Sequence, residues 1–175
     1  YKKPFTNYEN FIWNKTINDI LSTWKQIPKC ITHKDFHADN IMLHSTTNNN
    51  PHPYMLDYQC MEYAPFLYDI TSLITDHYIS IPQDYKNILI NHYIKNNHIS
   101  KLYNISTQQT LQWIDYISMQ RHLKNIGIFA RLATRDNKKQ YLKHIPRMLQ
   151  HMEEISQRQP TFTPLVNIII KRYIQ

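Results

Sequence analysis

The chain has 175 residues, a mass of 21.2 kDa and a formal net charge of +7 at pH 7. Its hydrophobic share of 42% and charged share of 19% are typical of a globular domain and exclude a disordered chain. We therefore expect one domain over residues 1–175. No apolar run approaches membrane-spanning length and neither end carries a signal peptide, so we expect no membrane partner. Two cysteines without a CxxC motif favour a reducing, cytoplasmic location.

The basic charge is spread along the chain in isolated pairs, of which Lys138–Lys139 and Lys171–Arg172 are examples. A nucleic-acid-binding domain more often gathers its basic residues on one face, with aromatic residues between them. We interpret the charge as a solvated basic surface and predict no nucleic-acid partner. The oligomeric state is left open by the sequence.

The first predicted element is a helix. Thr6 and Glu9 form a capping box of the T-x-x-E type, and Trp13, Ile17 and other apolar residues follow at helical spacing. Pro28 ends this pattern. Two short strands are then predicted, over residues 41–43 and 54–56. The polar segment 45–53 connects them, so the pair should form a hairpin.

After Asp57 the sequence predicts helices alone. Pro65 and Pro82 are suited to the first turn of two of them, and Ser106 with Gln109 forms a second capping box before a long helical stretch. An amphipathic segment follows over residues 141–152, and Pro160 and Pro164 precede a last short helix. The predicted fold is therefore α+β and mostly α, with one small β-hairpin.

The chemistry-bearing residues lie on either side of this hairpin. The run HKDFHADN at residues 33–40 contains Asp35 and Asn40, and the run MLDYQ contains Asp57. ATP-dependent phosphoryl transfer uses an acid, an amide and a second acid in this order. The first acid orients a hydroxyl, and the amide oxygen and second acid bind Mg²⁺. A hairpin brings all three within reach of one metal ion.

Gly127 is the single glycine of the sequence. Loops that enclose nucleotide phosphates, such as G-x-G-x-x-G, need several glycines. If ATP binds here, we expect another element, or residues outside this chain, to cover its phosphates.

The runs ITHKDFHADNIML, MLDYQ and APFLYDITSLITD resemble the aminoglycoside-phosphotransferase-like kinases. Together with the later run MQRHLKNIGIFARLATRD, they are most similar to the bacterial kinases that phosphorylate the anomeric hydroxyl of N-acetylmuramate and N-acetylglucosamine. The resemblance extends over residues 13–152. It implies a protein-kinase-like C-terminal lobe with the hairpin at its catalytic centre, while the N-terminal β lobe has no counterpart. It also implies ATP and Mg²⁺ as cofactors and an amino sugar as the small-molecule substrate.

The resemblance also assigns roles to individual residues. Asp35 would be the catalytic base facing the sugar hydroxyl, and Asn40 and Asp57 would be the Mg²⁺ ligands. His33 and Asp69 would support the catalytic loop without touching substrate.

Two departures from the subgroup pattern remove no chemical group. Ala64 stands where glycine is common, and Cys60 stands where a small or acidic residue is usual.

Four further residues are candidates for substrate contact. His37 and Asp39 point either at substrate or at solvent. Gln120 and Arg121 either line the sugar pocket or lie on a helix surface.

Two alternatives stay open at this point. His33, Asp35 and His37 alternate in a way that suits a metal-dependent hydrolase, with Asp76 among the further ligands. In the second alternative, the chain is a non-catalytic remnant of a kinase lobe. The shortage of glycine favours this interpretation.

Overall fold

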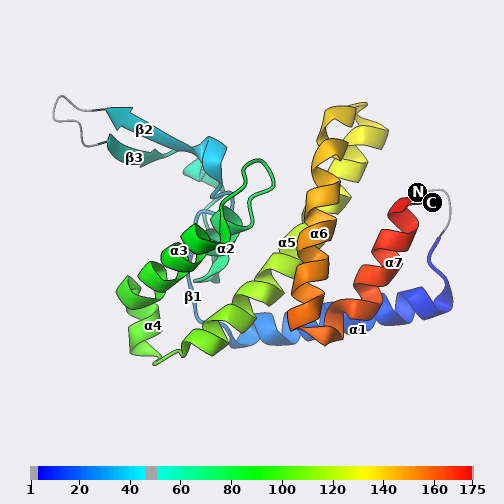
Figure 1. Ribbon diagram of the computed structural model, residues 1–175, viewed down its shortest axis with the longest axis horizontal. Coiled ribbons are helices and arrows are strands. Elements are labelled where there is room, and N and C mark those ends of the chain that lie inside the picture. The colour runs from blue at the N-terminus through cyan, green and yellow to red at the C-terminus, as the bar shows by residue number, and fades with distance from the viewer. Residues whose placement is uncertain (1–3, 46–50, 175) are drawn as a thin grey trace. The chain divides into compact units, whose positions relative to one another are not determined.

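The computed structural model describes residues 4–45 and 51–174 and is mostly helical, with two small antiparallel sheets (Figure 1). The α-helices are α1 (Asn7–Gln26), α2 (Tyr68–Ile74), α3 (Gln83–Asn96), α4 (His98–Leu102), α5 (Thr107–Arg135), α6 (Ile145–Arg158) and α7 (Thr163–Ile174). The strands are β1 (Lys29–Thr32), β2 (Ile41–Ser45), β3 (Pro51–Met55) and β4 (Glu62–Pro65). Short 3₁₀ helices are η1 (Ala38–Asn40), η2 (Tyr58–Cys60), η3 (Lys139–His144) and η4 (Pro160–Phe162).

The chain forms two compact units. Residues 27–114 form one unit, which contains both sheets and helices α2 to α4. Residues 1–26 and 115–175 form the other, an all-helical unit. The division falls inside α5, so this helix contributes residues to both.

The all-helical unit buries one apolar cluster from α1, α5, α6 and α7. Its fully buried members include Met119, Met148, Met152 and Phe162, and the Tyr116 and Phe162 rings lie 4.8 Å apart in an edge-on arrangement. Burial of this apolar surface is the main stabilising contribution to the unit. Within residues 4–45 and 51–174, no helix combines the length and the apolar character needed to cross a membrane.

The N-terminal capping box is confirmed. The Thr6 N–H donates to Glu9 Oε2 at 2.7 Å, and the Glu9 N–H donates to Thr6 Oγ1 at 3.2 Å. These reciprocal bonds satisfy N–H groups that the first turn of α1 leaves without helical partners. The helix ends at Gln26, two residues before the proline that predicts its end.

Glu9 also joins α1 to α7 within the all-helical unit. Arg172 donates from Nε to Glu9 Oε1 at 2.9 Å and from Nη2 to Glu9 Oε2 at 2.7 Å. The guanidinium also lies over the Phe5 ring, 4.6 Å from its centroid. The hydrogen bond from Arg172, followed by that from the Thr6 backbone, lowers the pKa of Glu9 from 4.5 to about 2.

Acid should therefore weaken the ion pair between Glu9 and Arg172. A carboxylate whose pKa is lower in the folded state than in the unfolded state stabilises the fold above the unfolded pKa, and the effect is lost as the pH falls through the folded pKa. For Glu9 this window runs from 4.5 down to about 2. We expect Glu9→Gln to lower the urea midpoint of unfolding at pH 6. Across that pH window, the midpoint of the variant should decrease less with falling pH than the midpoint of wild type does. The matched control is Glu153→Gln, at an exposed glutamate of α6, which should leave the pH slope unchanged. Equal slopes for Glu9→Gln and wild type would contradict the prediction.

The predicted hairpin is confirmed. Strands β2 and β3 pair antiparallel, with Ile41 opposite Met55 and Leu43 opposite Pro53. Both strands are longer than predicted, and residues 46–50 of the predicted connecting turn lie outside the described residues.

The prediction of helices alone after Asp57 is wrong for residues 62–65. These residues form β4, which pairs with β1 so that Thr32 faces Glu62 and Lys29 faces Pro65. The Thr32 hydroxyl adds a 3.0 Å hydrogen bond to the Glu62 carbonyl. The backbone hydrogen bonds of this strand come from pairing with a strand distant in sequence. A pattern of four residues therefore cannot predict it. Pro65 therefore ends a strand, and α2 begins three residues later.

Phe66 anchors the start of α2. Its ring stacks with Tyr93 and meets Trp113 edge-on, with centroid separations of 6.3 and 6.5 Å. The Tyr93 hydroxyl donates to the Phe66 carbonyl at 2.5 Å. Burial raises the pKa of Tyr93 well above its ordinary value, so the hydroxyl remains a donor. These contacts fix the helix that carries Asp69.

Candidate active site

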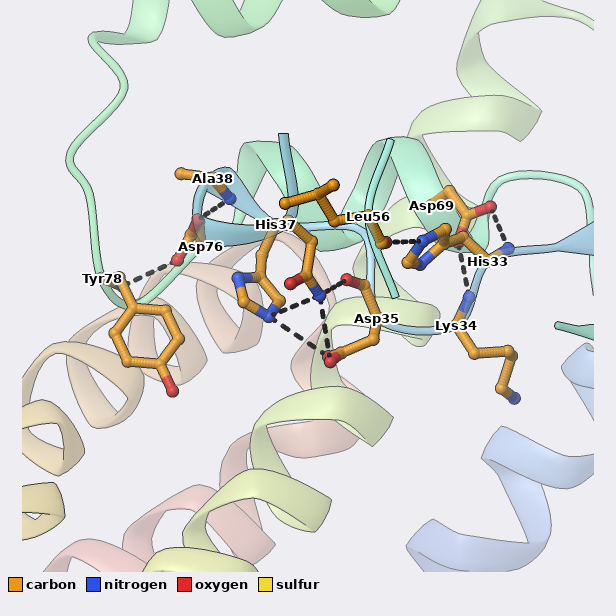
Figure 2. Close-up of polar contacts among 10 residues, drawn as sticks. His33, Lys34, Asp35, His37, Ala38, Leu56, Asp69, Asp76 and Tyr78 are labelled. Carbon is orange, nitrogen blue, oxygen red and sulfur yellow. Dashed lines mark hydrogen bonds and ion pairs between the residues drawn. The ribbon is translucent and has the colours of Figure 1, made fainter. Parts of the chain in front are cut away.

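The loop between β1 and β2 is joined to the segment after β3 through Leu56. His33 Nε2 lies 2.7 Å from the Leu56 carbonyl oxygen (Figure 2). The Leu56 N–H donates to the Asn40 carbonyl at 2.9 Å. A carbonyl only accepts, so His33 carries its proton on Nε2. Leu56 is thus held to both ends of the loop, and Asp57, the next residue, is held beside it.

Asp57 occupies the bend between β3 and η2. Its backbone is left-handed, with φ 56° and ψ 44°, a conformation that aspartate and asparagine adopt more readily than most residues. The side chain makes no capping bond to η2, and the residue is exposed. Its carboxylate is therefore accessible to a ligand.

Hydrogen bonds to Asp35 orient the Asn40 side chain. Asn40 Nδ2 lies 2.8 Å from the Asp35 carbonyl oxygen and 3.2 Å from Asp35 Oδ2, and it lies 3.3 Å from His37 Nε2. Both Asp35 oxygens only accept, so the amide nitrogen must face them. The carboxamide oxygen consequently points away from Asp35. An amide oxygen and the Asp57 carboxylate are hard oxygen ligands of the kind that Mg²⁺ prefers, so these residues fit this ion.

Asp35 projects from the loop with 61% of its side chain exposed. Its Oδ1 lies 3.4 Å from His37 Nε2, and the His37 ring lies 5.4 Å from the Tyr78 ring between centroids. Asp39 is exposed on η1. A carboxylate that contacts a substrate hydroxyl must be accessible, and Asp35 meets this requirement. Substrate contact by His37 and Asp39 stays a prediction.

Asp69 binds the start of the loop. Its Oδ2 accepts from the His33 N–H at 2.7 Å and its Oδ1 from the Lys34 N–H at 3.0 Å, the contacts that a supporting role requires (Figure 2). Lys34 has a φ of 71°, which costs a non-glycine residue about 1–3 kcal/mol. Each hydrogen bond to a charged acceptor contributes about 1.5–3 kcal/mol. The two bonds together outweigh the strain and hold the loop in this conformation.

Asp76 contacts the other end of the same loop, which the sequence reasoning did not foresee. Its Oδ2 accepts from the Ala38 N–H at 3.0 Å. Asp76 lies two residues past the end of α2, so no helical spacing relates it to Asp69, and no local pattern in the sequence indicates this contact.

The alternative hydrolase site is not formed. His33 turns Nε2 to a carbonyl, and His37 turns Nε2 to Asp35. In the part of the chain that the structure describes, no three His, Cys, Asp or Glu side chains gather so that they could hold a metal ion.

Gln120 and Arg121 lie on α5 in the all-helical unit, where Arg121 is buried and Gln120 half-buried. The alternative prediction that Arg121 lies on a helix surface is wrong, because the residue is buried. Contact of either residue with a sugar stays a prediction.

One loop and one hairpin join an acid, an amide and a second acid, in the order that phosphoryl transfer uses. Residues 9–102 match the phosphotransferase enzyme family, and this is more than half of the chain. The chain belongs to this family, which confirms the resemblance drawn from its motifs.

Three curated relatives are each 30% identical to the chain, and each is called N-acetylmuramate/N-acetylglucosamine kinase. The Neisseria meningitidis protein aligns over 170 residues, which is 97% of this chain and 49% of the relative. The Pseudomonas putida protein aligns over 166 residues (94% and 48%), and the Pseudomonas aeruginosa protein over 158 (90% and 45%). The chain therefore spans about half the length of these relatives.

Proposed function

We propose that the protein transfers the γ-phosphate of ATP to an amino sugar, at the anomeric hydroxyl of N-acetylmuramate or N-acetylglucosamine. The observation that carries the proposal is the pair of hydrogen bonds that the Leu56 backbone makes, one to the His33 ring and one to the Asn40 carbonyl. These bonds hold Asp57 beside the loop that contains Asp35. The names of the three relatives support the substrate class.

Each site residue has a separate task in this proposal. Asp35 orients the sugar hydroxyl and accepts its proton, since it is the accessible carboxylate of the loop. Asn40 and Asp57 would hold Mg²⁺ through the amide oxygen and the carboxylate. The bound ion would offset the negative charge of the phosphates. Asp69 and His33 keep the loop and the hairpin end in register.

Residues 1–175 correspond, in this proposal, to one helical C-terminal lobe of a protein-kinase-like fold. The mostly helical architecture supports it, as does α5, which supplies residues to both compact units.

The test is phosphate transfer by the complete protein. We expect ATP-dependent loss of the reducing end of N-acetylmuramate or N-acetylglucosamine, because a phosphate on the anomeric oxygen blocks ring opening. We also expect a requirement for Mg²⁺ or Mn²⁺, so excess EDTA should lower the rate by at least about 10³-fold, the effect of several kcal/mol of lost charge stabilisation.

Three results distinguish the parts of this proposal. Phosphate transfer that leaves the reducing end intact would move the reaction to another hydroxyl. Absence of transfer to either sugar would reject the substrate. Full activity in EDTA would reject the metal-assisted mechanism.

A further inference from the structure

Asp76 is a buried carboxylate that connects the catalytic loop to the segment following α2. It is 3% exposed, its Oδ2 accepts from the Ala38 N–H at 3.0 Å and its Oδ1 from the Tyr78 N–H at 2.7 Å (Figure 2). A carboxylate buried to this extent is unfavourable unless its oxygens accept hydrogen bonds. Both backbone groups are therefore held where the carboxylate needs them.

The Ala38 N–H is the first of η1. His37 occupies the N-cap position, and its side chain makes no capping bond, so the turn takes its acceptor from Asp76 instead. The same turn ends at Asn40. The direction in which Asn40 presents its amide therefore depends on the hydrogen bond from Ala38 to Asp76.

The second Asp76 oxygen acts on the same loop by another route. It holds the Tyr78 backbone, and the Tyr78 ring lies against His37 with 5.4 Å between centroids. His37 in turn lies 3.4 Å from Asp35. One carboxylate thus fixes the surroundings of both Asn40 and Asp35.

We propose that Asp76 is a positioning residue of the phosphotransfer site. It holds η1 so that Asn40 keeps its amide nitrogen on Asp35 and its amide oxygen available to Mg²⁺. The inference rests on the proposed function for the roles of Asp35 and Asn40. Asp69 fixes the start of the loop and Asp76 its end, so the loop is held on both sides of the base.

The experiment compares Asp76→Ala and Asp76→Asn with wild type in the complete protein, by titrating Mg²⁺ at fixed ATP. Removing a group that orients a metal ligand typically costs about 10–100-fold in metal affinity or activity. We expect Asp76→Ala to raise the half-saturating Mg²⁺ concentration by that factor and to lower kcat. Asp76→Asn keeps one acceptor oxygen, so it should show a smaller shift and guards against a folding defect in the alanine variant.

Asp115→Ala is the control for loss of a buried carboxylate elsewhere. Asp115 lies in the all-helical unit, 6% exposed, and accepts from Arg158 Nη2 at 2.7 Å and from Gln159 Nε2 at 3.3 Å. A purely structural loss lowers the folded fraction without changing the Mg²⁺ dependence of the folded protein. We expect this variant to be less stable than wild type and to retain the wild-type half-saturating Mg²⁺ concentration.

Amide hydrogen exchange provides a second measurement that does not require activity. The peptide covering residues 33–40 should exchange faster in Asp76→Ala than in wild type, and at the wild-type rate in Asp115→Ala. An active wild type with unchanged Mg²⁺ dependence in both Asp76 variants would overturn the inference. If wild type transfers no phosphate, the proposed function fails. The exchange result then decides about the loop, and unchanged exchange in Asp76→Ala would overturn the positioning role.

Discussion

Asp57→Asn is expected to abolish phosphate transfer while leaving the fold intact. The substitution keeps the size of the side chain but removes its negative charge. Asn40, the other proposed Mg²⁺ ligand, is neutral and cannot replace that charge. A metal ion contributes several kcal/mol through charge stabilisation, and each ~1.4 kcal/mol changes the rate tenfold. We therefore expect kcat to fall by at least about 10³-fold in the assay of sugar phosphorylation.

The fold should survive because the backbone requirement at this position is met by both residues. The left-handed conformation at Asp57 is accessible to asparagine, and the Asp57 side chain makes no capping bond that the amide would lose. Thermal unfolding should therefore match wild type within about 0.5 kcal/mol, the range for surface substitutions without such features. Asp84→Asn, at an exposed acid in the first turn of α3, is the matched control and should keep full activity. Retained turnover in Asp57→Asn would remove Asp57 from the metal site.

The parts of the site that the sequence predicts are those set by local spacing. Asp35 and Asn40 are five positions apart on one loop, and a hairpin returns the chain to Asp57, so proximity follows from the hairpin alone. The capping box of α1 is local in the same way, because its two partners are three residues apart. Short-range geometry of this kind needs no knowledge of the rest of the fold.

The parts that escape prediction depend on contacts between distant segments. Strand β4 forms because β1 lies beside it, thirty or more residues earlier in the chain, and its own four residues carry no distinctive strand pattern. Asp76 presents the same difficulty. An acid in the segment after a helix is usually solvated, and only the folded loop brings the Ala38 N–H to it. The strained Lys34 backbone is equally non-local, since Asp69 holds it from 35 positions away.

The two kinds of residue also differ in exposure, which explains why motifs find one and miss the other. Asp35 and Asp57 are exposed, as groups that meet a ligand need to be, and the motif predicts them from the chemistry proposed for them. Asp76 is buried, and it acts only through hydrogen bonds to the backbone of other residues. Motifs describe the first class, whereas a role played through hydrogen bonds to distant backbone becomes visible only in the folded structure.

Asp35→Ala should lower kcat by about 10²–10⁴-fold, the range for loss of a general base and orienting group. The KM for ATP should change little. Asn40 Nδ2 would lose its 3.2 Å contact with Asp35 Oδ2 but keep the shorter 2.8 Å bond to the Asp35 carbonyl, which the substitution leaves in place. The predicted metal ligand therefore stays oriented while the proton acceptor is removed. Initial rates measured with ATP and sugar varied independently separate these two quantities.

Asp35→Asn sharpens the same test, because it retains a polar group of the same size but not the basicity. If the carboxylate acts by accepting a proton, the asparagine variant should be about as slow as the alanine variant. If the residue acts mainly by orienting the hydroxyl, asparagine should recover much of the rate. An alanine variant within a few-fold of wild type would show that another group accepts the proton. His37, whose Nε2 lies 3.4 Å from Asp35 Oδ1, would then be the residue to replace next.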